Sequence, residues 1–108
     1  MKDLKLRKAL VKYCEEEGLE ESEQPLILDN HEYDESIIGI SSDGRLIYDY
    51  DAMIEEFARD EGCSIEEAQE WVDYNTMRAL PYIHGKKPII MTNKEFLMFQ
   101  YYDGEEEE

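Results

Sequence analysis

The side chains with the greatest potential for chemistry lie close together between positions 71 and 78. Trp71, Tyr74 and Arg78 are spaced at i, i+3 and i+7, so that on a helix the guanidinium can stack on the rings. Tyr, Trp and Arg are also the residue types that most often dominate binding energies between proteins. The sequence therefore predicts a partner-binding cluster, whose members are Tyr50, Trp71, Tyr74, Asn75 and Arg78.

A structural interpretation of the same residues stays open. Aromatic side chains at helical spacing usually belong to a core. Asn75 follows Val72 by three residues on the predicted apolar side, where its amide would need hydrogen-bond partners such as the backbone of a neighbouring hairpin. In this interpretation the guanidinium of Arg78 pairs with one of three carboxylates, Asp49, Asp51 or Asp73.

Carboxylates on the predicted helices form rows that can imitate the phosphates of DNA. Residues three or four positions apart on a helix recur every ~5 Å, and each strand of duplex DNA carries a charge every ~3.4 Å. Such rows would occupy a cationic groove of another protein. The alternative is that the acidity serves only solubility. The candidate residues are Glu55, Glu56, Asp60, Glu66, Glu70 and Asp73.

The charge of the chain is strongly acidic and unevenly distributed. The formal net charge is −17 over 108 residues, and between Tyr13 and Gly44 there are eleven carboxylates and no Lys or Arg. Cations gather in the first dozen residues and again between Arg78 and Lys94. Because binding to phosphates relies on Lys and Arg, we expect a protein partner with a basic surface and no direct contact with nucleic acid.

No pattern in the sequence predicts catalysis, a cofactor or a metal ion. Asp43, Asp49 and Asp51 lack the order of a calcium-binding loop, and helix capping explains them better. Without an export signal or a membrane span, we expect a non-enzymatic cytoplasmic protein with reduced thiols. The other candidates are isolated from one another and from any nucleophile motif: His31, His84, Cys14 and Cys63.

A β-hairpin is the clearest local prediction. The runs 36–41 and 45–48 are rich in Ile and flank Ser42-Asp43-Gly44. Asp-Gly at the two central positions predicts a two-residue type I′ turn. The resulting register would place Ile40 opposite Ile47, and Gly39 opposite Tyr48, so that the tyrosine ring covers the backbone of the glycine.

A helical hairpin over Asp51–Leu80 is predicted to follow the β-hairpin. Its second helix carries an apolar side that includes Val72 and Ala79. Its ends are marked by four signals: Asp49 or Asp51 before the first helix, Gly62 after it, the S-x-x-E capping box at 64–67 before the second helix, and Pro81 after it.

Together the elements predict an α+β fold with a small, mainly antiparallel sheet built on the β-hairpin and the helical hairpin packed on one face. A first helix over about Asp3–Glu17, a strand at Pro25–Asp29 and a last strand at Pro88–Met91 complete it. Phe96–Tyr102 fits either a short helix or a strand. We expect one domain over residues 1–102 and a disordered acidic tail over 103–108.

Three stretches of sequence are similar to a family of short acidic proteins from prophages and other mobile elements of Gram-positive bacteria. They are Asp-Glu-Ser-Ile-Ile-Gly at 34–39, Asp-Gly-Arg-Leu-Ile-Tyr-Asp-Tyr-Asp at 43–51, and Glu-Trp-Val-Asp-Tyr-Asn-Thr-Met-Arg-Ala-Leu-Pro-Tyr at 70–82. The resemblance covers nearly half of the chain. It implies a mobile-element accessory protein of the host cytosol, and it implies no activity, because the family has none assigned.

These observations lead to competing hypotheses about function. The first is an accessory protein that binds another protein, in its most specific form an inhibitor that mimics DNA and blocks a host nucleic-acid or defence enzyme. The second is a structural or regulatory homodimer with a self-complementary aromatic strip, whose acidity serves only solubility. The third, an enzyme, would need a pocket in which a titratable residue meets a nucleophile or a metal ion.

Overall fold

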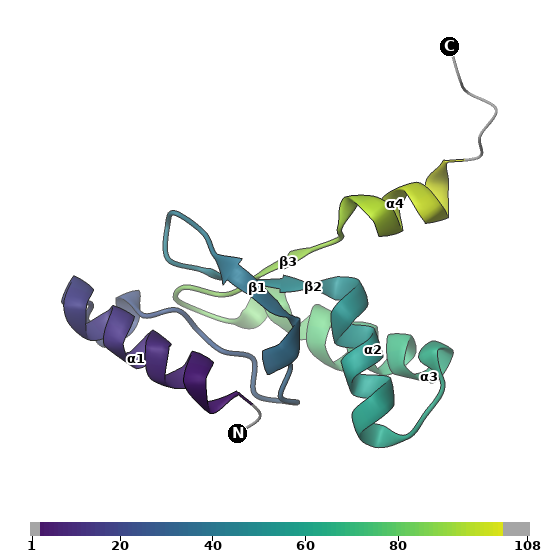
Figure 1. Ribbon diagram of the computed structural model, residues 1–108, viewed down its shortest axis with the longest axis horizontal. Helices are drawn as coiled ribbons and strands as arrows, with labels where there is room; N and C mark the ends of the chain where they lie inside the picture. The colour runs from purple at the N-terminus through teal and green to yellow at the C-terminus, as the bar shows by residue number, and fades with distance from the viewer. Residues whose placement is uncertain (1–2, 103–108) are drawn as a thin grey trace, which may run out of the picture.

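A three-stranded sheet lies at the centre of the fold, as the computed structural model in Figure 1 shows. The structure describes residues 3–102, and the predicted tail at 103–108 lies outside them. The strands are β1 (Ile37–Ile40), β2 (Leu46–Asp49) and β3 (Ile89–Met91), in the order β1-β2-β3. The first pair is antiparallel and the second is parallel. The α+β fold built on the β-hairpin is confirmed.

Helices flank the sheet at both ends of the molecule. α1 (Leu4–Glu17) lies at one end, α2 (Tyr50–Glu61) and α3 (Ile65–Trp71) lie together at the other, and α4 (Lys94–Tyr101) projects away from the body (Figure 1). α4 shows that the segment at 96–101, for which helix and strand were both open, is helical. Shorter helical segments are η1 (Glu21–Glu23), η2 (Asp34–Ser36), η3 (Val72–Thr76) and η4 (Met77–Tyr82).

The turn of the β-hairpin differs from the predicted type I′ turn. A type I′ turn needs positive φ at both central residues, but among the non-glycine residues described none has a positive φ, whereas Gly44 has φ 85°. The Gly44 N–H donates to the carbonyl of Ser41 (3.0 Å), and the Ser41 N–H donates to the carbonyl of Arg45 (2.8 Å). This is a three-residue loop, in which a type I turn precedes a left-handed glycine.

The longer loop moves the register of the hairpin by one residue. Gly39 faces Ile47, and Ile40 faces Leu46, so both predicted pairs are wrong. The register shifts again between Ile37 and Gly39, which brings Tyr48 opposite Ile37. Open space lies above Gly39, because a Cβ built there meets no atom within 4 Å. The ring of Tyr48 therefore does not cover the glycine, and it is fully buried in the core.

The predicted strand at Pro25–Asp29 is wrong. Pro25 forms only a single parallel bridge with Lys86, and residues 26–29 belong to no strand. The Leu28 N–H donates to the hydroxyl of Tyr48 (3.0 Å) instead of to a strand. A side chain thus satisfies a backbone group that a β-ladder would otherwise bond, and Leu28 remains buried without a strand.

The helical hairpin connects the parallel strands β2 and β3, and its predicted caps are confirmed. Asp49 accepts hydrogen bonds from the N–H groups of Asp51 (3.1 Å) and Ala52 (3.3 Å) at the start of α2. Gly62 ends α2 with φ 69°. Ser64 and Glu67 form the reciprocal capping box of α3, with both distances 3.1 Å. These signals are local, which explains why the sequence reveals them.

The chain beyond α3 stays helical longer than predicted. η3 is a π-helical turn and η4 is a 3₁₀-helix that contains Pro81, so the predicted helix end at Leu80 is wrong by two residues. Proline fixes φ near −65°, which a 3₁₀-helix accepts. The segment ends with a hydrogen bond that the Ile83 N–H donates to the carbonyl of Leu80 (3.1 Å).

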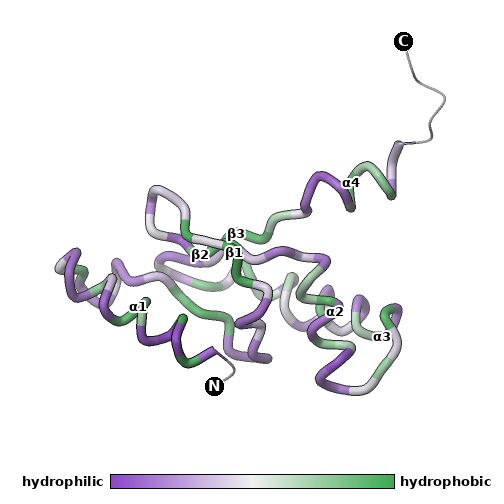
Figure 2. Tube along the Cα trace, viewed as in Figure 1, coloured by the Kyte–Doolittle hydropathy of each residue, from purple (hydrophilic) through white to green (hydrophobic). Residues whose placement is uncertain are grey.

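The hydrophobic core lies between β2, α2 and the α3–η3 segment. Tyr48, Met53 and Val72 are each 0% exposed, and Tyr33 from the loop before β1 joins them. Figure 2 shows hydrophobic stretches along the strands and in α2, with hydrophilic stretches on the outer helical turns. No helix within residues 3–102 combines the length and apolar character needed to span a membrane.

A buried ion pair joins α1 to the body. The Arg7 guanidinium donates to both carboxylate oxygens of Asp34, at 2.9 and 2.7 Å, and the side chain of Asp34 is 1% exposed. The Asp3 N–H donates to the same carboxylate (3.2 Å). The hydrogen bonds that Arg7 donates to Asp34, together with the negative charge of that carboxylate, raise the pKa of Arg7. No residue of α1 is fully buried.

Candidate partner-binding surface

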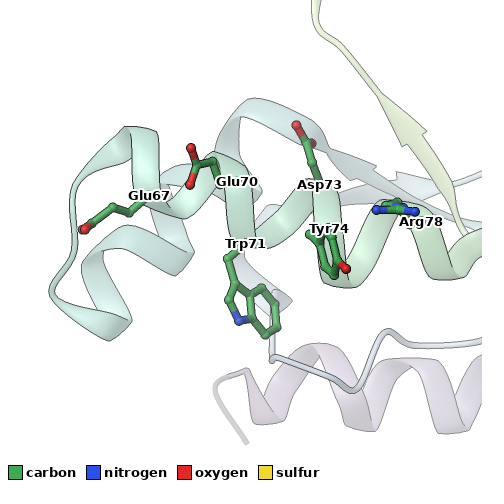
Figure 3. Close-up of a pocket in the computed structure, with 6 residues that line it drawn as sticks. All are labelled: Glu67, Glu70, Trp71, Asp73, Tyr74 and Arg78. Carbon is green, nitrogen blue, oxygen red and sulfur yellow. The ribbon is translucent and has the colours of Figure 1, made fainter.

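A hollow of about 650 Å³ lies over the α3–η4 segment. In Figure 3 the rings of Trp71 and Tyr74 extend from the same side of the helix, and the carboxylates of Glu70 and Asp73 lie on the opposite side of the ribbon. One stretch of backbone therefore presents aromatic rings on one side and carboxylates on the other, and both groups line the same hollow. The residues that line the hollow are Glu67, Glu70, Trp71, Asp73, Tyr74 and Arg78.

The aromatic half of the hollow has one fixed ring and one exposed ring. Trp71 is half-buried and stacks on Phe57, with ring centroids 4.5 Å apart and an interplanar angle of 22°. Tyr74 is 68% exposed, and the Arg78 guanidinium lies 4.7 Å from its ring centroid. The predicted stacking of Arg78 on an aromatic ring is confirmed for Tyr74. The stack also shows that this ring face holds a cation.

The predicted pairing of Arg78 with Asp49, Asp51 or Asp73 does not occur among the ion pairs of residues 3–102. Asp49 caps α2 instead. The Tyr50 hydroxyl donates to Oδ1 of Asp73 and so joins α2 to the hollow. Burial, together with this hydrogen bond to Asp73, raises the pKa of Tyr50 to about 12.

Asn75 is exposed, contrary to the prediction that it lies on the apolar side. Its side-chain Nδ2 donates to the backbone carbonyl of Trp71 (3.1 Å). The backbone carbonyl of Asn75 accepts from Asn30 Nδ2 (3.0 Å). Thr76 takes the inward position and is 1% exposed. Its hydroxyl lies 3.1 Å from the Tyr33 hydroxyl and donates to Asn30 Oδ1 (3.3 Å).

The helix that carries Val72, Asn75 and Thr76 contains a π-helical turn at η3. On an α-helix both i+3 and i+4 lie on the face of residue i, so the spacing from Val72 leaves Asn75 and Thr76 as alternatives for the inward position. In the structure Thr76 takes that position. No local sequence signal marks such a turn, so spacing alone could not reveal it.

The first acidic row does not form a continuous surface. Glu55 is exposed, but Glu56 is only 2% exposed. Its carboxylate accepts from the Ser36 hydroxyl (2.7 Å) and from the Glu35 N–H (3.3 Å). Asp60 lies 3.0 Å from His31 Nε2. Glu56 is thus unavailable to a partner, and Asp60 already has one within the chain.

The second acidic row remains at the surface. Glu66 and Glu70 are exposed, and Asp73 is half-buried beside the Tyr50 hydroxyl. These carboxylates share a second, smaller hollow that adjoins the first one through Glu70 and Asp73. The sequence did not single out Glu67, which also lines the larger hollow, because its place in the capping box already explained it. A residue that caps a helix can therefore also line a surface hollow.

Within residues 3–102 no group of three or more His, Cys, Asp or Glu side chains is arranged to hold a metal ion. Cys14 and Cys63 are free thiols, and both are half-buried. The ring of His31 is packed between those of Tyr33 and Phe57, at centroid distances of 5.0 and 4.8 Å.

Comparisons of this chain with models of protein families, with curated proteins and with solved structures found no significant match. The similarity to acidic mobile-element proteins therefore stays a prediction from sequence. The geometry of the α3–η4 surface is the remaining basis for an assignment of function.

Proposed function

We propose that this protein is a non-enzymatic binding protein, and that the hollow over α3 and η4 receives a cationic segment of another protein. The observation that carries the proposal is the exposed Tyr74 ring beside Trp71, with the carboxylates of Glu67 and Glu70 at the same hollow. An exposed aromatic ring beside carboxylates suits an arginine or lysine side chain, because the ring face and the negative charge both attract a cation.

Two further features support a basic partner. Arg78 already lies over Tyr74, so the ring face is attractive to a guanidinium within this same chain. The net charge of −17 would draw a cationic partner from a distance and raise the association rate at low salt. The stacking of Trp71 on Phe57 adds rigidity, because a fixed ring loses little conformational entropy on binding.

The setting that we propose is that of an accessory protein of a phage or another mobile element, acting in the host cytosol. This part of the proposal depends on the sequence similarity of residues 34–82 alone. Its most specific form, inhibition of a nucleic-acid enzyme by mimicry of DNA, depends on the row Glu66, Glu70 and Asp73. The burial of Glu56 removes the other row from that argument.

The test uses the fluorescence of Trp71, which is the single Trp of the chain. Synthetic peptides of alternating Arg and Ala would be titrated into the full chain, with peptides of alternating Glu and Ala as the matched control. We expect the basic peptide to change the emission and bind severalfold more weakly at about 200 mM than at about 50 mM salt. Equal responses to both peptides, or an affinity independent of salt, would show the proposal to be wrong.

A further inference from the structure

Arg78 supplies a cation to the Trp71 hollow from within the chain itself. Its guanidinium carbon lies 4.7 Å from the ring centroid of Tyr74, and Figure 3 shows the two side chains next to each other at the η4 end of the hollow. Both residues line the hollow, so the ring face that Arg78 covers belongs to the hollow wall. A cation of this chain therefore already lies where a cation of a partner would stack.

The guanidinium of Arg78 has no other side-chain partner among residues 3–102. The ion pairs and side-chain hydrogen bonds of these residues do not include it, although three carboxylates line the same hollow. Arg78 and Tyr74 are both exposed to solvent. A cation–π contact at an exposed site is weak, so a competing cation can displace Arg78 from the ring.

The chemistry of the contact favours arginine over lysine as the competing side chain. A guanidinium is planar and weakly hydrated, and it stacks flat on an aromatic ring. The ammonium group of lysine is compact and strongly hydrated, so it loses more on leaving water and stacks less well. An incoming arginine thus replaces the Arg78 contact with an equal one, whereas an incoming lysine replaces it with a weaker one.

We propose that Arg78 is an internal placeholder for an arginine side chain of the partner. The inference rests on the proposed function, because it concerns the same hollow and names the residue type that enters it. On binding, the partner's guanidinium takes the place of Arg78 on the Tyr74 ring. Until then Arg78 lowers the apparent affinity of the hollow, because only molecules with an uncovered ring are competent to bind.

The test compares two basic peptides of equal length and charge, one of alternating Arg and Ala and one of alternating Lys and Ala. Each is titrated into the full chain, and binding is followed by the emission of Trp71. We expect the arginine peptide to bind the wild-type protein about threefold more tightly than the lysine peptide. Equal affinities would show that the ring face does not select a guanidinium.

Arg78→Lys isolates the role of the placeholder, because it keeps the charge and exchanges only the stacking group. We expect this variant to bind the arginine peptide roughly twofold more tightly than the wild type does, since an ammonium is the weaker competitor. Arg78→Gln leaves no cation on the ring, and we expect it to bind about threefold more tightly. Unchanged or weaker binding by both variants would overturn the inference.

A double-mutant cycle separates the ring from the charge. In a Tyr74→Ala background, Arg78→Gln still removes a positive charge, but there is no ring left to uncover. We therefore expect its gain in affinity to shrink to that of Lys8→Gln, which removes an exposed cation from α1. An equal gain from Arg78→Gln with and without Tyr74 would show that Arg78 acts by charge alone.

The same titrations distinguish a failure of this inference from a failure of the proposed function. If neither basic peptide binds the wild-type chain, the proposed function is wrong and the placeholder falls with it. If both peptides bind but the Arg78 variants do not differ from the wild type, the hollow is a cation site and only the placeholder is wrong.

Discussion

The two acidic rows have the same residue types and similar helical spacing but opposite fates. On α2, Glu56 is buried against Ser36 and Asp60 bonds His31, so the row is used within the protein. On α3 and η3, Glu66 and Glu70 face solvent beside the aromatic hollow. The difference arises because η2 and the loop before it pack over α2, whereas no described element covers the outer face of α3.

This contrast teaches that spacing along a helix gives the direction of a carboxylate but not its environment. A carboxylate that points toward another segment becomes a structural acceptor if that segment offers donors. Ser36 and the Glu35 N–H are such donors, and they lie about twenty residues before Glu56. The same chemical group is available for binding only where nothing lies opposite.

The largest expected effect is on the stability of the protein, and it comes from a substitution in the buried row on α2. Replacement of Glu56 by Ala leaves the Ser36 hydroxyl and the Glu35 N–H without their acceptor and opens a cavity in the core. We expect the free energy of unfolding to fall by about 3 kcal/mol, as measured by urea denaturation. The neighbouring Glu55→Ala should change it by less than about 0.5 kcal/mol. Similar losses for both variants would contradict the assignment of Glu56 to the core.

The corresponding change on the α3 side should affect binding and leave folding intact. Tyr74→Ala removes the exposed ring, and we expect the affinity for a basic peptide to drop about tenfold. Because Tyr74 is 68% exposed, the midpoint of urea denaturation should hardly move. Glu70→Gln should weaken the same binding a fewfold and reduce its dependence on salt. Glu16→Gln on the distant face of α1 is the control.

The hydrogen bond between Tyr50 of α2 and Asp73 of the hollow can be tested through the pH dependence of stability. The pKa of Tyr50 is raised to about 12 by burial and by Asp73, so the folded protein holds this proton more tightly than the unfolded chain. The contribution of the protonated Tyr50 hydroxyl to the free energy of unfolding is complete below about pH 10, and it is lost as the pH rises toward 12.

Tyr50→Phe removes this proton, together with the hydrogen bond to Asp73. We expect a loss of about 1 kcal/mol at neutral pH and a shallower decline of stability between about pH 10 and 12. Urea midpoints at a series of pH values compare the variant with the wild type. Parallel curves would mean that Tyr50 titrates alike in both states.

The smallest expected effect concerns the other bonded carboxylate of α2. Asp60→Asn keeps a hydrogen-bond partner for His31 and removes only the charge. Because Asp60 is partly exposed, we expect a change of less than about 1 kcal/mol in the free energy of unfolding. A change as large as that of Glu56→Ala would show that exposure does not separate the two positions.

The sequence predicted the features that depend on a few adjacent residues. Gly62 and the Ser64–Glu67 box act within one helical turn and are confirmed, and of the two predicted alternatives for the first cap the structure has Asp49. The stacking of Arg78 on Tyr74 likewise needed only helical spacing. Such signals are legible because the interacting groups are neighbours along the chain.

Features that depend on distant segments or on small backbone differences were missed. The turn at Asp43-Gly44 is compatible with two loop lengths, and the choice between them changes every pair in the hairpin. The π-helical turn at η3 has no sequence signature, and helical spacing alone does not decide between Asn75 and Thr76 for the inward position. The burial of Glu56 depends on donors from η2. The residues that line the hollow include five that the sequence analysis named and one, Glu67, that it did not; the five are Glu70, Trp71, Asp73, Tyr74 and Arg78.

The buried carboxylate of Asp34 makes the beginning of the chain indispensable. Its counter-ion, Arg7, is supplied by a helix that has no fully buried residue of its own. A protease that removed α1 would take away the guanidinium that Arg7 supplies to this buried carboxylate, and breaking such a pair costs about 3 kcal/mol. Proteolytic removal of α1 should therefore lower the free energy of unfolding by more than its few buried contacts suggest.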